Sequence, residues 1–258
     1  MKLTWLGTAG FVVEANDQTF LIDPYLSRNS QARPAQNLQP EDIAKAGRIF
    51  ITHGHFDHLY DVPNIMAKGA AAVYCSEIAG TTLRRQGVNS SRIKVITSDG
   101  YLADFGGYQA QAFFSRHIKF DLPLIAKALL RTGTKFRRLA KTVKAYQKGQ
   151  VLSWRFTING YTLHHFGSGG STTEELERLS TFPLDLLLVP LQGHTHICDI
   201  AWQYVRMLQP RLVIPIHHDD FYPPISTAVD IDPFVKKVRE HCPGTEVRLM
   251  AVNETITL

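Results

Sequence analysis

Short hydrophobic runs recur along the whole chain, and their alternation with polar positions predicts mainly strands in its first half. A strand buried on one face shows hydrophobic and polar residues in turn, whereas a helix repeats them every three or four positions. Strand-like runs of this half lie at residues 2–7, 10–15, 19–23, 48–52, 71–76, 92–97 and 108–117. Because short connections separate the first three runs, they predict an antiparallel meander at the start of the chain.

Two pairs of strand-like runs in the second half predict β-hairpins. The run 153–167 contains Asn159 and Gly160, the dipeptide that best accepts the two positive φ angles of a type I′ turn. The chain closes with two further runs, 246–252 and 254–258, which we interpret as a second hairpin.

Buried strands and helices alternate between these two pairs. Residues 184–190 and 210–216 are almost continuously apolar, as expected of strands that are covered on both faces. Residues 171–180 begin with Ser and Thr followed by Glu, a helix-capping pattern, and residues 198–210 form a second helical run that stops at a proline. Strands in two groups with helices outside them predict a layered α/β sandwich.

Composition places the chain among globular proteins. Its 258 residues are 44% hydrophobic and 20% charged, which suits one large domain over residues 1–258. No apolar run approaches the roughly 20 residues that would span a bilayer. The three cysteines are odd in number and widely spaced, which argues against a disulfide framework and leads us to expect a cytoplasmic protein.

Positive charge is concentrated in one segment, residues 119–150, which we call the basic insertion. It carries nine basic residues and one acidic residue, a net charge of +8, whereas the whole chain carries +5 and the remainder therefore −3. Residues 121–131 predict a mostly apolar helix, and residues 135–148 predict a second helix. The apolar stripe of that second helix comprises Phe136, Leu139 or Ala140, Val143 and Tyr146.

Three roles fit this pattern of charge and apolar residues. The basic insertion is a lid that packs on the sandwich, a cap that gathers anionic amphiphilic substrates, or a surface that rests peripherally on an anionic membrane.

Four potential metal ligands follow the strand-like run 48–52. The stretch "ITHGHFDHLYD" places His53, His55, Asp57 and His58 within six positions. They cannot share one face of a helix, but a loop at a strand end can wrap them around a common centre. Imidazole and carboxylate donors suit zinc, manganese or iron better than calcium or magnesium, so we expect one or two such divalent ions, zinc above all.

This His-x-His-x-Asp-His motif resembles that of the metallo-β-lactamase superfamily, and the resemblance extends over nearly the full chain. "LIDPYL", "FFSRH" and "VIPIHHDDF" resemble further motifs of the superfamily. "WLGTAGFVVE" and "LLVPLQGHTH" resemble the branch of L-ascorbate-6-phosphate lactonase and N-acyl phosphatidylethanolamine phospholipase D. The resemblance implies a four-layered αββα sandwich with the metals between the two sheets at one edge.

The resemblance also implies which further residues hold the metals. His117 would complete the first site with His53 and His55, and His217 would complete the second with Asp57 and His58. Between the adjacent histidines we favour His217, because it directly follows the buried run, and place His218 nearer the surface or behind the ligands. Asp23 would support the metal loop from behind the ligands.

The chain departs from the family pattern at the turn "HHFGSGGS", where Ser168 stands in place of the usual bridging aspartate. Without that carboxylate, two divalent ions balanced by Asp57 and a bridging hydroxide would retain a charge of about +2 in a partly buried site, which disfavours the second ion. Asp219, His165 or a substrate phosphate are candidates to compensate for the missing charge.

Other polar stretches allow two interpretations each. "GHTHICD" offers His194, His196 and Cys198 as a separate zinc site, but a fourth ligand is lacking, and we expect His194 to contact substrate instead. The glycine-rich "GSGGSTTEE" either binds an anion with its backbone N–H groups or is a flexible turn before a capped helix.

Together these features predict a metal-dependent hydrolase. A metal-bound hydroxide would cleave an ester, lactone, amide or phosphodiester bond in an anionic small-molecule or lipid-like substrate. Asp57 could also orient the nucleophile if the second ion were absent.

Two alternatives use the same residues. The superfamily's transfer-RNA 3′-end nucleases carry a basic arm between their third and fourth motifs, so an RNA-processing nuclease is the first alternative. The acidic remainder of the chain argues against a nucleic-acid partner. A metal-binding module with little catalysis is the second alternative, and the missing bridging aspartate favours it.

Overall fold

Two seven-stranded sheets face each other in the computed structural model, which describes residues 1–133 and 144–258. The first sheet, in spatial order, contains β14 (Thr255–Thr257), β1 (Lys2–Gly7), β2 (Gly10–Ala15), β3 (Gln18–Ile22), β4 (Arg48–Phe50), β5 (Ala72–Cys75) and β6 (Ile93–Val95). The second contains β13 (Glu246–Val247), β12 (Leu212–Ile216), β11 (Leu186–Pro190), β10 (Tyr161–Phe166), β9 (Val151–Ile158), β8 (Gln109–Ser115) and β7 (Tyr101–Asp104).

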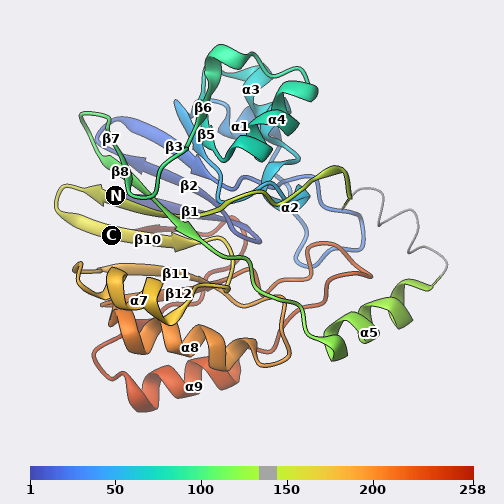
Figure 1. Cartoon of the computed structure of the whole chain (residues 1–258), viewed down its shortest axis with the longest axis vertical. Helices are drawn as coiled ribbons and strands as arrows, with labels where there is room; N and C mark the ends of the chain where they lie inside the picture. The colour runs from blue at the N-terminus through green and yellow to red at the C-terminus, as the bar shows by residue number, and fades with distance from the viewer. Residues whose placement is uncertain (134–143) are drawn as a thin grey trace.

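Helices cover the outer face of each sheet (Figure 1). The first sheet is covered by α1 (Pro40–Ile43), α2 (Phe56–Leu59), α3 (Val62–Lys68) and α4 (Glu77–Arg85), with a short 3₁₀ helix at Ser90–Arg92 before β6. The second sheet is covered by α7 (Thr173–Ser180), α8 (Ile197–Leu208) and α9 (Asp232–His241). The predicted αββα sandwich is therefore confirmed.

An aromatic core joins the two sheets. Phe20 of β3 stacks on Phe156 of β9 with ring centroids 4.7 Å apart, and Phe50 of β4 packs edge-on against Trp154 of β9 at 4.9 Å. All four side chains are fully shielded from solvent. Since burying one such side chain is worth roughly 1.5–3 kcal/mol, these contacts fix the sheets face to face.

The opening meander and the first hairpin are confirmed. β1, β2 and β3 pair antiparallel in chain order. β9 and β10 form the hairpin, and both of its turn residues have positive φ, 51° at Asn159 and 81° at Gly160.

The predicted second hairpin is wrong, because its two runs belong to different sheets. β13 pairs parallel to β12, with Glu246 opposite Leu212, whereas β14 pairs antiparallel to β1, with Ile256 opposite Leu3. The chain between them crosses from one sheet to the other. Each short strand covers an outer edge, which would otherwise expose the unpaired backbone groups of β12 or β1.

Strand ends from both sheets meet at one edge of the sandwich. β3 and β4 run parallel in the first sheet, and β10, β11 and β12 run parallel in the second. The loops that leave these carboxyl ends therefore emerge together, which is where side chains from distant parts of the sequence can converge.

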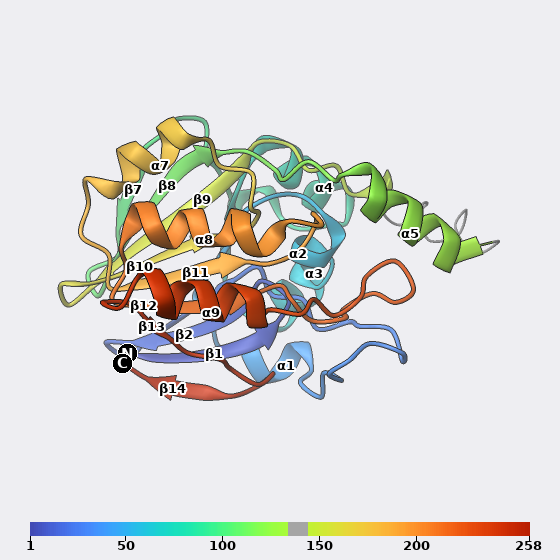
Figure 2. The ribbon, with the colours of Figure 1, turned by 90° about the horizontal axis from the view of Figure 1, so that it is seen from below.

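The first predicted helix of the basic insertion is α5 (Leu122–Thr132), which extends away from the layers at this same edge (Figures 1 and 2). Phe136, Leu139, Ala140 and Val143, four positions of the predicted apolar stripe, lie outside the described residues. Tyr146 is buried, and its hydroxyl accepts a hydrogen bond from Gln86 Nε2 at 2.6 Å. In the described part of the chain, every helix is too short or too polar to cross a bilayer.

Candidate metal centre

Six side chains from three segments of the chain form two groups at this edge. His53 and His55 lie on the turn between β4 and α2, and Asp57 and His58 lie on α2 itself. One of the other two follows β8, and the last directly follows β12. The groups, which we call the first and second cluster, are His53, His55 and His117, and Asp57, His58 and His217. Within each cluster, one nitrogen or carboxylate oxygen of every member lies within 4.8 Å of the others. The structure thus brings together all six predicted ligands.

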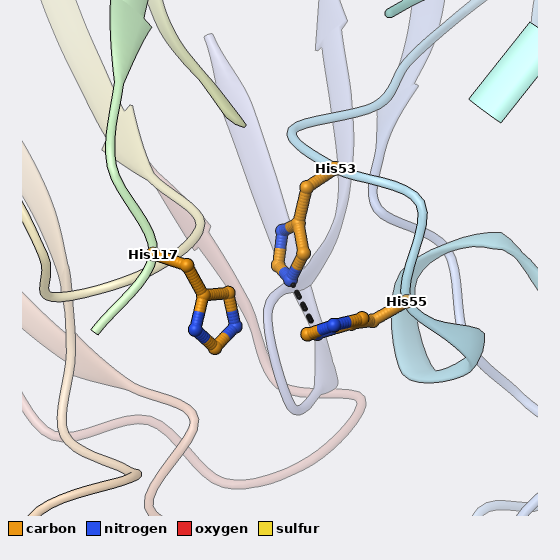
Figure 3. Close-up of side chains that lie close together, drawn as sticks. All are labelled: His53, His55 and His117. Carbon is orange, nitrogen blue, oxygen red and sulfur yellow. Dashed lines mark hydrogen bonds between the residues drawn. The ribbon is translucent and has the colours of Figure 1, made fainter. Parts of the chain in front are cut away.

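The first cluster consists of three imidazole rings that face one another (Figure 3). His53 Nε2 lies 3.1 Å from His55 Nδ1, and the ring centroid of His117 lies 5.0 Å from that of His53 and 4.6 Å from that of His55. His117 Nδ1 donates a hydrogen bond to the carbonyl oxygen of Ile118 at 2.7 Å. A carbonyl can only accept, so Nδ1 carries the proton and Nε2 keeps its lone pair.

The three rings of the first cluster are neutral at neutral pH. Burial holds the pKa of His53 well below its ordinary value, and it lowers the pKa of His55 to about 4. Burial lowers the pKa of His117 as well. In His53 the neighbouring imidazoles add to this effect, because a proton on one ring repels a proton on the next. Neutral imidazole is the form that binds a metal ion.

The second cluster adds a carboxylate. Asp57 Oδ2 lies 3.2 Å from His217 Nε2 and 3.6 Å from His58 Nε2. Burial alone would raise the pKa of Asp57, but His58 and His217 outweigh it and hold this pKa well below the ordinary range. Asp57 is therefore ionised at neutral pH, and it is the one carboxylate among the six clustered residues.

Asp23 lies directly behind the second cluster. Its fully buried carboxylate accepts hydrogen bonds from the Thr52 backbone N–H at 2.8 Å and the Thr52 hydroxyl at 2.5 Å. It also lies 2.7 Å from His58 Nδ1. Although burial lowers the pKa of His58, Asp23 and Asp57 raise it overall. Because Nδ1 donates to Asp23, His58 presents Nε2 to the cluster, an arrangement that orients metal-binding histidines.

These donors fit divalent metal ions. Most are buried, the rings turn nitrogens toward one another, and His217 Nδ1 has no hydrogen-bond partner within the described ranges. Three neutral imidazoles suit an ion with one open position, and an imidazole–carboxylate set suits a second ion.

Three of the predicted supporting residues lie outside both clusters. Ser168 Oγ accepts the Ile118 backbone N–H at 3.0 Å, so its hydroxyl holds the residue after His117. His165 is buried, with Nε2 donating to the Ala9 carbonyl at 2.8 Å. Asp219 pairs with Arg28 Nη2 at 2.6 Å. That Ser168 replaces a bridging carboxylate stays a prediction.

His194 lies on the loop after β11, where the neighbouring Gln192 and Gly193 contribute to the wall of the pocket described below. Its Nδ1 accepts the His196 backbone N–H at 3.0 Å, and its side chain is not part of that wall. His194, His196 and Cys198 do not form a metal-binding group in the described parts of the chain. Contact between His194 and substrate stays a prediction.

The glycine-rich turn after β10 allows close packing beside the first cluster. A Cβ on Gly170 would lie 2.2 Å from the carbonyl carbon of His117, so only glycine lets the two loops pass. The helix that follows is capped as predicted, with Thr172 Oγ1 accepting the Glu175 N–H at 3.3 Å.

Arg28 is a residue whose role the sequence did not indicate. Its guanidinium pairs with Asp219 at 2.6 Å and donates to Thr8 Oγ1 at 3.0 Å, and both charged side chains are almost fully buried. Asp219 accepts the Thr8 N–H at 3.0 Å, while the Thr8 carbonyl accepts the His217 N–H at 2.8 Å. A Cβ on Gly7 would lie 1.9 Å from Arg28 Nη2. Arg28 and Asp219 thus clamp the turn that holds the backbone of His217.

Arg28→Met should loosen the second cluster and leave the first intact. Losing the clamp frees the Thr8 turn, and changes behind metal ligands lower affinity by roughly 10–100-fold. Calorimetric titration of metal-free protein should show this loss for the second ion alone. Arg33→Met, which alters an exposed arginine on the same loop, is the matched control. Equal affinities in Arg28→Met and the control would show that the clamp does not position His217.

A pocket of about 560 Å³ opens above the clusters. All six clustered residues and Ser168 contribute to its lining. The other walls are mainly apolar and come from α5 and from the loop after His217; their apolar residues are Phe120, Leu124, Ile125, Ala128, Leu129, Phe221, Tyr222 and Ile225.

Comparison with known proteins agrees with this architecture. The family model described as "Beta-lactamase superfamily domain" matches residues 2–217. A "UPF0173 metal-dependent hydrolase" of Aeropyrum pernix is 28% identical over 262 residues, covering 98% of this chain and 96% of its own.

Two solved structures share the fold. Igni18, described as a novel metallo hydrolase from Ignicoccus hospitalis, has a TM-score of 0.71 and 23% identity, with 99% of this chain and 97% of that one covered. An isothiocyanate hydrolase from Delia radicum gut bacteria has a TM-score of 0.69 and 18% identity. The match covers 100% of this chain and 99% of that hydrolase. The family match spans most of the chain, from β1 to His217, and the chain therefore belongs to the metallo-β-lactamase superfamily.

Proposed function

We propose that this metal-dependent hydrolase cleaves an ester, lactone, amide or phosphodiester bond in an anionic, partly apolar substrate. The observation that carries the proposal is the position of both clusters at a pocket whose other walls are mainly apolar. Polar donors confined to one part of an apolar pocket fix the reacting group, while the walls bind the rest of the molecule. The name shared by the UPF0173 relatives supports metal-dependent hydrolysis.

Each cluster would hold one ion. His53, His55 and His117 would bind the first, and Asp57, His58 and His217 the second. Such ions lower the pKa of water to about 7 and polarise the oxygen of the bond under attack. If the second ion were absent, the ionised Asp57 carboxylate would accept a hydrogen bond from the attacking water and so orient it.

Basic residues at the pocket support an anionic substrate. Arg131 and Lys144 line it. The Lys148 carbonyl accepts a hydrogen bond from the backbone N–H of Gly54 at 2.8 Å, so Lys148 lies beside the loop of His53 and His55. Positive charge around an apolar cavity attracts anionic substrates and raises their association rate.

Three finer assignments belong to this proposal. The donor set supports zinc, with manganese or iron as alternatives. "WLGTAGFVVE" and "LLVPLQGHTH" support a place near the branch of L-ascorbate-6-phosphate lactonase and N-acyl phosphatidylethanolamine phospholipase D. The three free cysteines support a reducing, cytoplasmic setting.

A series of p-nitrophenyl esters of increasing acyl length tests the apolar pocket. With the metal-loaded protein, kcat/KM should rise with acyl length until the cavity is filled. Ala128→Trp places a large side chain in the wall and should lower kcat/KM for the longest ester about tenfold or more, because one methylene in such a pocket is worth ~1–3 kcal/mol. Ala128→Trp should lower kcat/KM for the acetate ester far less.

Ala126→Trp is the matched control for this substitution, because Ala126 lies on the same helix but is exposed and outside the lining. Two results would contradict the proposal: hydrolysis that persists fully in metal-free protein, or equal effects of the two tryptophans. Cleavage of RNA in preference to esters, lactones and phosphodiesters of small molecules would favour the nuclease instead.

A further inference from the structure

Almost every side chain of helix α5 is at least partly exposed to solvent. Thr132 is its one buried residue, although the helix is rich in leucine. Leu122 is 80% exposed and Leu130 is 85% exposed, and the preceding Phe120 is 53% exposed. Figures 1 and 2 show the helix extending from the edge of the sandwich into space.

The exposed apolar residues of the described chain are concentrated here. Five of the ten large hydrophobic residues that are exposed lie between residues 120 and 130. Single exposed leucines are normal, but a contiguous apolar surface of this kind marks a site of interaction. An isolated helix of 11 residues is also marginal in water, so a partner that covers its leucines would stabilise it.

The same surface is positively charged. Lys119, Lys127 and Arg131 lie on or beside α5, and the exposed Lys144 and Lys148 follow where the described chain resumes. Asp121 is the acidic residue of this segment, and its carboxylate accepts hydrogen bonds from the Thr195 hydroxyl and backbone N–H. A partner must therefore bury leucine side chains and compensate positive charge at the same time.

We propose that α5 and Phe120 dock into the interface of an anionic lipid bilayer. Apolar residues would enter the acyl boundary while Lys119 and Lys127 meet lipid phosphates, the arrangement typical of interfacial helices. A second copy of the chain would bring equal positive charges together. A nucleic acid would satisfy the charge but leave Leu122 and Leu130 in water.

The helix also connects the bilayer to the pocket. Leu124 and Ala128, its less exposed side, line the pocket above the clusters. An amphiphile held in the bilayer can pass along α5 into this cavity without crossing open water. This second step rests on the proposed function, whereas docking itself does not.

Vesicle co-sedimentation of the full-length, metal-loaded protein tests docking without any turnover. Vesicles of phosphatidylcholine with phosphatidylglycerol should bind the protein, and vesicles of phosphatidylcholine alone should bind it much more weakly. The double variant Leu122→Ser/Leu130→Ser should weaken binding about tenfold or more, given the ~1.5–3 kcal/mol that burial of one leucine contributes.

Matched controls distinguish binding through this surface from nonspecific adsorption to the vesicles. Leu102→Ser removes an exposed leucine on β7, and it should leave vesicle binding unchanged. Lys127→Glu should weaken binding, whereas Lys236→Glu on α9 should not. The double variant should hydrolyse a short soluble ester like the wild type, because Leu122 and Leu130 do not line the pocket.

Several outcomes would overturn the docking proposal. They are absence of vesicle binding, equal binding to neutral and anionic vesicles, or equal losses in the double variant and Leu102→Ser. A dimer that dissociates in the double variant while vesicle binding stays absent would assign the surface to a second copy. Salt-sensitive RNA binding without vesicle binding would assign it to nucleic acid. None of these outcomes alters the proposed hydrolysis.

Discussion

His117→Ala is expected to abolish tight metal binding and hydrolysis together. His117 is the one member of the first cluster that comes from the second sheet, so its loss leaves two imidazoles from a single loop. A metal ion contributes several kcal/mol to the stabilisation of a hydrolytic transition state, so activity should fall roughly a thousandfold or more. Elemental analysis and ester hydrolysis of the same preparation measure both effects.

His196→Ala provides the matched control, because His196 is exposed and belongs to neither cluster. It should keep wild-type metal content and activity. Circular dichroism shows whether His117→Ala still folds. A folded His117→Ala protein with full metal content would mean that His117 does not hold the first ion.

Ser168→Asp is expected to tighten binding of the second ion. Asp57 is the one carboxylate among the clustered donors, so two divalent ions would leave positive charge uncompensated. The Ser168 hydroxyl lines the same pocket and holds the backbone N–H of Ile118. A carboxylate within about 4–6 Å of a cation is worth ~1–3 pKa units, which corresponds to roughly 10- to 1,000-fold in affinity.

Ser168→Asn separates the effect of charge from that of shape, because asparagine has the size of aspartate without its charge. The affinity of this variant for the second metal ion should stay near that of the wild type. Titration calorimetry of the three proteins compares them directly. Two equally tight sites in the wild type would contradict this account. In that case Asp219 is a poor candidate for the bridge, because Arg28 and Thr8 already occupy its oxygens.

Local sequence patterns predicted the parts of the fold and site that depend on neighbouring residues. Alternation set the meander, and Asn159-Gly160 set the turn of the hairpin. The spacing of His53, His55, Asp57 and His58 was informative for the same reason, since one short turn and the helix α2 that directly follows it place all four. His53 and His217 each follow a buried strand, which indicated that both side chains lie at the edge of the sandwich where these strands end.

Features that depend on distant partners were not predictable in this way. Alternation identifies a strand but not its neighbour, and so β13 and β14 were wrongly paired. Nothing close in the sequence links Arg28 to Asp219, although their ion pair is buried. A leucine-rich helix such as α5 normally predicts packing against a core, and only the structure shows its leucines exposed.

The most direct test of the central claim is the metal content of protein purified without chelators, followed by removal and return of the metal. The account predicts one tightly bound ion per chain and a second that is substoichiometric. Chelation should remove hydrolysis, and one equivalent of zinc, or of the ion found, should restore it. Metal-free protein that hydrolyses its substrate at the full rate, or folded protein that takes up no ion in titration, would contradict the assignment of this edge as a metal centre.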